Sequence, residues 1–149
     1  MKKIIESQIS LLSGAIRTSV PVQILYDKDE VEMALTYKDI EYCGVGNDNL
    51  WVDAFADLQR KLPGNVQLAC CMTCRHGNMC PYGNKENQIF CTKDVLISSK
   101  YAIIELMDNK GFDSFFEREV SSINYCDDFV YQSDDSYTYN NFLYHLQKN

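Results

Sequence analysis

Three cysteines near the middle of the chain have the spacing of a metal site. Cys71 and Cys74 form a Cys-x2-Cys pair, Cys91 follows after sixteen residues, and Asp94 completes a Cys-x2-Asp pair. A tight turn in a Cys-x2-Cys segment points both sulfurs at one tetrahedral ion, with Zn–S bonds of about 2.3 Å. The overall spacing is that of a zinc ribbon with aspartate in the last position. The sequence therefore predicts a structural zinc held by Cys71, Cys74 and Cys91.

Four side chains compete for the fourth position of this site. Cys80 and His76 lie in the loop between the cysteines, Asp94 lies just beyond it, and Cys126 comes from a distant segment. Structural zinc is commonly held by four thiolates, and aspartate is a less usual ligand. We therefore expect Cys80 or Cys126 to complete the site.

The Cys71–Cys74 pair has a second interpretation, as the redox centre of a thiol-dependent enzyme or sensor. Such pairs work when the first thiolate lies at a helix N-terminus, and residues 75–78 (Arg-His-Gly-Asn) are a poor helix start. The sequence has two histidines, no phosphate-binding glycine loop and no hydrolase or zinc-protease motif. A metal- or thiol-dependent enzyme is therefore the alternative hypothesis, and the remaining thiols of Cys43 and Cys70 are expected to be buried free cysteines.

The second signal is an acidic region rich in aromatic residues near the C-terminus. Residues 105–135 contain nine acids and two bases, so this stretch carries as much negative charge as the whole chain, whose net charge is −7. Excess negative charge repels phosphate backbones, so no nucleic-acid partner is expected, whereas carboxylates and tyrosines suit a basic protein. The alternative interpretation needs no partner: about half of these rings fill the core, and the acids are a solvated face. The residues predicted to contact a basic partner are Asp127, Asp128, Tyr131, Asp134, Asp135, Tyr137 and Tyr139.

The elements before the cysteines are predicted from the periodicity of apolar residues. Apolar positions about four apart favour a short helix over residues 3–17, and alternation predicts a hairpin of strands 22–26 and 31–37. A third strand is expected at residues 40–42, with the pattern broken by Gly44 and Gly46. A helix capped by Asp48 or Asn49 should run to residue 62, where Pro63 and Gly64 end it, and a strand over 66–70 should lead into the cysteine loop.

The elements after Cys91 are predicted in the same way. Strands are expected over residues 95–97, 101–107 and 124–132, a helix from Asp113, a turn at 133–136 and a short terminal helix at 139–146. The predicted fold is one α+β domain over residues 1–149, with a small antiparallel sheet, flanking helices and a Cys-rich metal-binding loop.

Composition excludes several classes of protein. The chain has 149 residues, of which 46% are hydrophobic and 23% charged, as in ordinary globular domains. Its apolar runs are far shorter than the roughly 18 residues that a membrane span needs. The start, Met1-Lys2-Lys3, is basic like a secretory signal, but Glu6 interrupts any apolar segment after it. We therefore expect a cytoplasmic protein that neither crosses nor binds a membrane.

A set of short motifs resembles an uncharacterised bacterial protein family of similar length. The motifs are Leu-Gln-x-x-Leu-Pro at 58–63, the Cys-x-x-Cys, a Pro-Tyr-Gly turn at 81–83, the lone Cys91, and Tyr-Cys-Asp-Asp-Phe at 125–129. In that family the residue before Pro-Tyr-Gly is usually serine, whereas this chain has Cys80. The resemblance therefore implies that Cys126, not Cys80, is the fourth ligand, and it implies no known activity. The expected function is a zinc-stabilised acidic protein-interaction domain, such as an immunity or antitoxin-like inhibitor of a basic partner.

Overall fold

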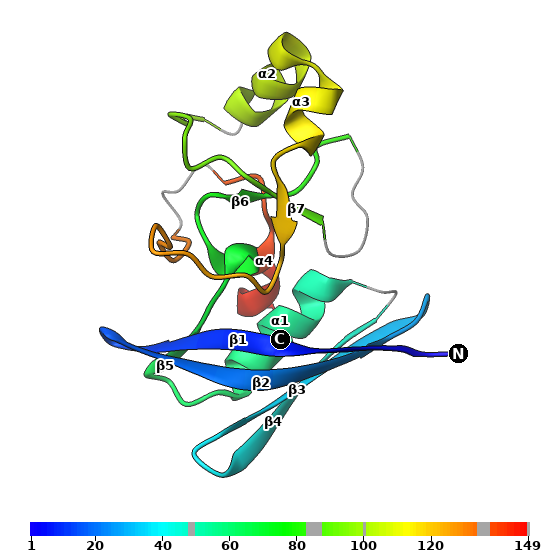
Figure 1. Cartoon of the computed structure of the whole chain (residues 1–149), viewed down its shortest axis with the longest axis vertical. Helices are drawn as coiled ribbons and strands as arrows, with labels where there is room; N and C mark the ends of the chain where they lie inside the picture. The colour runs from blue at the N-terminus through cyan, green and yellow to red at the C-terminus, as the bar shows by residue number, and fades with distance from the viewer. Residues whose placement is uncertain (48–49, 83–87, 100, 134–137, 149) are drawn as a thin grey trace. The chain divides into compact units, whose positions relative to one another are not determined.

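The computed structural model describes residues 1–47, 50–82, 88–99, 101–133 and 138–148 (Figure 1). Its residue contacts fall into two compact units, one of residues 1–69 and 141–149 and the other of residues 70–140. None of the helices in these described ranges is long and apolar enough to span a membrane. The single domain expected over residues 1–149 stays a prediction.

The first unit contains a curled antiparallel sheet of five strands in the order β4-β3-β2-β1-β5. The strands are β1 (Lys3–Ser13), β2 (Ile16–Tyr26), β3 (Glu30–Tyr37), β4 (Ile40–Asn47) and β5 (Val66–Ala69). Alternate side chains such as Val22, Ile24, Val31 and Met33 are buried, as expected for a sheet with one covered face. The predicted hairpin, the strand at 40–42 and the strand at 66–70 are confirmed, and so is the mixed α+β class.

The helix predicted over residues 3–17 is wrong, because this segment forms β1, a turn and the start of β2. Ile5 and Ile9, four residues apart, share one face of a strand as well as one face of a helix. Leu11, two residues further on, is also buried, which only the strand period explains. Gly14 has a φ of +62°, and this conformation, which glycine adopts readily, turns the chain back so that Ser13 pairs with Ile16.

Helix α1 (Trp51–Lys61) covers the buried face of this sheet and confirms the helix predicted up to residue 62. The predicted cap at Asp48 or Asn49 lies outside the described residues. Trp51, Phe55 and Leu58 are fully buried on its inner side. The break expected at Gly44 and Gly46 is wrong, since β4 continues to Asn47. A Cβ atom on Gly44 would meet the backbone oxygen of Ala54 and the backbone nitrogen of Leu58, so glycine is needed for close packing of the helix.

Polar side chains of α1 also bind the backbone at both edges of the sheet. At β4, Asp57 Oδ2 accepts a hydrogen bond of 2.9 Å from the N–H of Val45, and Lys61 Nζ donates one of 2.8 Å to the carbonyl of Cys43. At β5, Gln59 accepts from the N–H of Leu68 at 2.7 Å and donates to the carbonyl of Val66 at 2.8 Å. One helix therefore satisfies edge groups that would otherwise invite another strand.

Helix α4 (Phe142–Gln147) belongs to the first unit and confirms the terminal helix predicted at 139–146, with a later start. His145 Nδ1 lies 2.8 Å from Asp53 Oδ1 on α1, and Arg60 donates to the carbonyl of His145 at 2.6 Å. Phe142 is fully buried. These contacts fix the last described turn of the chain to α1.

The second unit contains a short turn of 3-10 helix, a small sheet and two helices. The turn is η1 (Cys71–Thr73), and the sheet has the order β6 (Gly77–Asn78), β7 (Gln88–Cys91), β8 (Glu119–Ser121). Helices α2 (Tyr101–Lys110) and α3 (Phe112–Phe116) follow one another in sequence and pack together. The buried cluster of this unit consists of Cys80, Phe90, Ile103, Met107 and Phe115, with Ile97, Leu106 and Tyr139 packed against it.

Several elements predicted for this unit are wrong. Residues 101–107 form the first part of α2, because Ile103 and Met107 bury one helical face, and residues 95–97 form no strand. The helix expected from Asp113 is present as α3 but ends at Phe116. Residues 124–132 run through turns, with a single bridge between Tyr131 and Cys74, where we predicted a strand. The turn predicted at 133–136 lies almost entirely outside the described residues.

Candidate metal centre

The Cys71–Cys74 pair lies on the tight turn formed by η1. The N–H of Cys74 donates to the carbonyl of Cys71 at 3.3 Å, and the N–H of Gly77 donates to the carbonyl of Cys74 at 3.0 Å. The N–H of His76 points at the Sγ atom of Cys74, at 3.5 Å. A backbone donor on sulfur favours the thiolate form, which is the form that binds metals.

Pairing of β6 with β7 brings Cys91 to this turn. Gly77 pairs with Cys91, and the N–H of Thr92 donates to the carbonyl of His76 at 2.9 Å. A Cβ atom on Gly77 would overlap the carbonyl oxygen of Cys71, so glycine is needed for this close approach. Cys91 is therefore held beside the turn by backbone hydrogen bonds.

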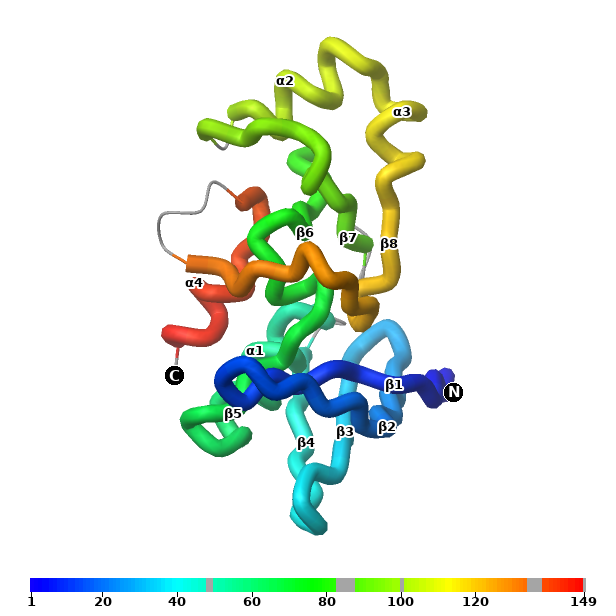
Figure 2. The backbone as a smooth tube through the Cα atoms, turned by 60° about the vertical axis from the view of Figure 1, so that its left-hand side comes forward, coloured from blue at the N-terminus to red at the C-terminus, as the bar shows by residue number. Residues whose placement is uncertain are grey.

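The segment of residues 122–132 crosses the same turn and carries Cys126 (Figure 2). The N–H of Met72 donates to Ser122 at 2.9 Å, and the N–H of Cys71 donates to Asn124 at 2.8 Å. Further along, the N–H of Arg75 donates to the carbonyl of Val130 at 2.8 Å. Because both ends of the segment are bonded to the turn, the intervening Cys126 stays near it.

The other three predicted ligands all contribute to the pKa of the Cys71 thiol. Burial raises the pKa of Cys71 to about 12, and the thiols of Cys70, Cys74, Cys91 and Cys126 add to this rise. Burial likewise raises the pKa of Cys74, with further contributions from Cys91 and Cys126. Within the described ranges, however, His, Cys, Asp and Glu side chains form no group of three or more arranged to hold a metal ion.

The other candidates for the fourth position have different surroundings. Cys80 is buried in the apolar cluster of the second unit, between Phe90 and the α2 side chains. Asp94 forms a two-bond ion pair with Arg118, at 2.5 Å and 3.2 Å. His76 is partly buried, and burial, followed by the nearby Arg75, lowers the pKa of its imidazole. Of the four candidates, Cys126 is the one whose thiol contributes to the pKa of Cys71.

Two basic side chains lie around the cysteines. Lys93 Nζ lies 4.0 Å from Cys126 Sγ and forms an ion pair of 3.1 Å with Asp128. Its hydrogen bond with Asp128, followed by the charge of Cys126, raises the pKa of Lys93. Arg118 donates to the carbonyl of Cys91 at 3.1 Å. Positive charge is thus present where thiolates would carry negative charge.

The residues predicted to bind a partner occupy different environments. Asp127 and Asp128 are exposed, although Asp128 also pairs with Lys93. Tyr131 is half-buried, and burial raises its pKa to about 12. Tyr139 packs against the buried cluster of the second unit, so its ring contributes to the core. The remaining three, Asp134, Asp135 and Tyr137, lie outside the described residues.

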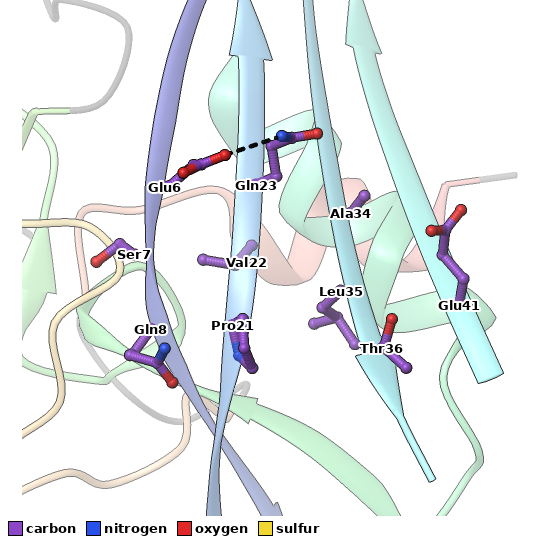
Figure 3. A pocket seen from close by; sticks show the side chains of 10 residues that line it. All are labelled: Glu6, Ser7, Gln8, Pro21, Val22, Gln23, Ala34, Leu35, Thr36 and Glu41. Atoms are coloured by element: carbon purple, nitrogen blue, oxygen red, sulfur yellow. Dashed lines mark hydrogen bonds between the residues drawn. The ribbon is translucent and has the colours of Figure 1, made fainter. Parts of the chain in front are cut away.

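A hollow of about 620 Å³ on the sheet of the first unit was not predicted (Figure 3). It is lined by side chains of β1 to β4, and both charged residues in it, Glu6 and Glu41, are acidic. Gln23 donates to Glu6 at 3.3 Å, as the dashed line in Figure 3 shows. Sequence analysis missed this hollow because it treated residues 3–17 as a helix, which removes β1 from the sheet.

No protein-family model matches the chain, and no curated protein matches its sequence. The resemblance to an uncharacterised bacterial family therefore stays a prediction.

Proposed function

We propose that this protein is a zinc-stabilised, acidic protein-interaction domain in which Cys71, Cys74, Cys91 and Cys126 hold one structural zinc ion. The observation that carries the proposal is that these cysteines lie on three segments, far apart in sequence, that the fold brings together. Backbone hydrogen bonds hold these segments together. A metal ion bound there would cross-link the turn, β7 and the segment of residues 122–132.

The chemistry of the donors fits zinc. Four thiolates are a common ligand set for structural zinc, and such a closed site leaves no position for a substrate. Four thiolates around a divalent ion carry a net charge of −2, which Lys93 and Arg118 would partly offset. The second unit has a small buried cluster, and a bound metal would add the stability that such small cores lack.

A metal- or thiol-dependent enzyme, or a redox sensor, is the weaker hypothesis. Reactive cysteines have lowered pKa values and lie in exposed, electropositive surroundings. Here burial raises the pKa values of both Cys71 and Cys74. Without metal these thiols would be poor nucleophiles at neutral pH, which weighs against redox chemistry.

The interaction function rests on charge. The chain has a net charge of −7, Asp127 and Asp128 are exposed, and the two charged side chains in the sheet hollow are Glu6 and Glu41. Carboxylates steer basic partners and speed their association. We therefore propose a basic protein as partner, as for an immunity or antitoxin-like inhibitor, in a cytoplasmic setting.

Metal analysis tests the zinc site. Purified protein is expected to hold about one zinc per chain, and a chelator is expected to lower its melting temperature, because structural zinc supplies on the order of 10 kcal/mol of binding free energy. Cys126→Ser should lose most of the zinc, whereas Cys43→Ser, on the sheet of the first unit, should keep it. A metal-free wild type whose melting temperature ignores chelator, or equal zinc retention by both variants, would contradict the proposal.

Binding kinetics test the interaction function. The probe is the protein that co-purifies from the native cell, which is expected to be basic, and its association and dissociation rates are measured across a salt series. Changing both Asp127 and Asp128 to Asn should slow association at low salt and leave dissociation nearly unchanged, since steering acts on the encounter. Asp29→Asn in the first unit is the control. If the captured partner is acidic, or if both variants behave like wild type, the acidic residues are solvated surface only.

A further inference from the structure

The second unit has a hollow of about 540 Å³, lined by both basic and apolar residues. Its basic residues follow the first cysteine pair and Cys91, and its apolar residues lie after Asp94 and in the segment of residues 122–132. Its basic and apolar lining includes Arg75, His76, Lys93, Leu96, Ile97 and Val130.

Positive charge is concentrated in this hollow although the unit is acidic. Residues 70–140 contain four described Lys and Arg side chains, and two of them, Arg75 and Lys93, line the hollow. Lys93 is paired with Asp128, and Asp94, which also lines the hollow, is paired with Arg118. In the described part of the chain, the guanidinium of Arg75 has no hydrogen-bond or ion-pair partner. Among the described residues, therefore, none competes with a ligand for the charge of Arg75.

The uncharged polar residues of the hollow, Asn78 and Thr92, are already hydrogen-bonded. Asn78 is buried, and its amide donates to the carbonyl of His76 at 3.1 Å and to Thr92 Oγ1 at 2.9 Å. The oxygen of the same amide accepts from the N–H of Tyr139 at 2.7 Å. These groups have little capacity left for a ligand, so recognition of its charge would fall to Arg75.

The apolar wall is open to solvent. Leu96 is 92% exposed and Val130 is 43% exposed, while Ile97 packs against the buried cluster of the unit. An apolar group laid against Leu96 and Val130 would remove hydrocarbon surface from water, which is favourable by about 25 cal/mol per Å². The hollow thus offers a cation and an exposed hydrocarbon surface to one ligand.

From these features we propose that the hollow binds a small organic anion that carries a carboxylate head and an apolar tail. Arginine pairs with carboxylates through two parallel hydrogen bonds, and no side chain among the described residues occupies the Arg75 guanidinium. The tail would lie against Leu96, Ile97 and Val130. Inorganic phosphate shares the charge but has nothing to place on the apolar wall. The site does not depend on the zinc proposed above, because neither Arg75 nor Leu96 is a ligand.

Titration with simple probes, followed by backbone NMR shifts of the full chain, tests this site. Hexanoate is expected to bind with a Kd on the order of 1 mM and to shift the signals of residues 75, 93 and 96. Acetate and inorganic phosphate lack the apolar tail, and hexylamine lacks the negative charge. Each of the three should therefore bind at least about tenfold more weakly than hexanoate.

Two variants and one control complete the experiment. Arg75→Gln should weaken hexanoate binding about tenfold or more, and Leu96→Ser should weaken hexanoate but not acetate. Lys28→Gln removes one positive charge from the first unit and should change neither hexanoate binding nor acetate binding. Unchanged melting temperatures would show that the variants fold. The proposal is overturned if hexanoate gives no saturable shift, or if phosphate or hexylamine binds as tightly as hexanoate. It is also overturned if the Arg75→Gln variant binds hexanoate as tightly as wild type.

Discussion

Gln59 provides the sharpest test of the physical account of the first unit. Its amide makes two hydrogen bonds to strand β5, one from the N–H of Leu68 at 2.7 Å and one to the carbonyl of Val66 at 2.8 Å. Both of these residues are almost completely buried. Gln59→Ala would therefore take a partner from two backbone groups that water reaches poorly.

The expected loss can be estimated from these two bonds. Depriving a buried backbone group of its partner costs about 1–3 kcal/mol, and replacing Gln by Ala in a helix changes propensity by only a few tenths. Because Gln59 itself is partly exposed, water can replace some of the lost bonding. We therefore expect Gln59→Ala to lower the free energy of unfolding by about 2–4 kcal/mol. Gln59→Glu keeps the acceptor but places a carboxylate oxygen against the carbonyl of Val66, so it should also destabilise.

Trp51 supplies the assay. It is the one tryptophan of the chain, it lies on α1, and it is buried, so its fluorescence in urea reports unfolding of the first unit. Gln67→Ala, on the exposed side of β5, is the matched control and should stay within about 0.5 kcal/mol of wild type. If Gln59→Ala also stays within that range, the two edge bonds contribute nothing and the reasoning fails.

Three further predictions follow from the same structure. Gly44→Ala should destabilise by about 2–3 kcal/mol in thermal or urea unfolding, because its Cβ would meet α1 backbone, whereas Gly64→Ala, in open space, should be nearly neutral. Burial alone would raise the pKa of Asp57, but the N–H of Val45 and the charges of Lys61 and Arg60 outweigh it and lower the pKa. The stability that ionised Asp57 contributes is therefore complete above the unfolded-state pKa of about 3.9 and is lost as the pH falls through the folded-state pKa. Asp57→Asn should therefore reduce the fall in the free energy of unfolding at acid pH. The same acid dependence in the variant and in wild type would refute this. Cys80→Ala should keep about one zinc per chain in metal analysis while losing about 1 kcal/mol of stability, because its thiol packs in an apolar cluster, and loss of the zinc would make Cys80 a ligand instead.

The sequence alone determined those features whose signal is local. Alternation over residues 22–26 and 31–37 defined a hairpin, and helical spacing over residues 51–61 defined α1, because each pattern fits one period only. The Cys-x2-Cys pair likewise indicated a tight turn that presents two thiols. Residues 3–17 lacked such a signal, since apolar residues four apart fit both a strand and a helix, and pairing with β2 and β5 decided the outcome.

Tertiary structure decided what depends on partners distant in sequence. Gly44 interrupts a strand pattern locally, but it is needed because the α1 backbone packs on it. Cys80 and Cys126 look alike as candidate ligands in sequence, and their surroundings differ. Cys80 is enclosed by Phe90 and the side chains of α2, whereas hydrogen bonds from the cysteine turn to residues 122–130 hold Cys126 close to Cys71. No local pattern encodes these contacts, because a backbone hydrogen bond specifies no side chain and a buried thiol can serve equally as an apolar side chain or as a ligand.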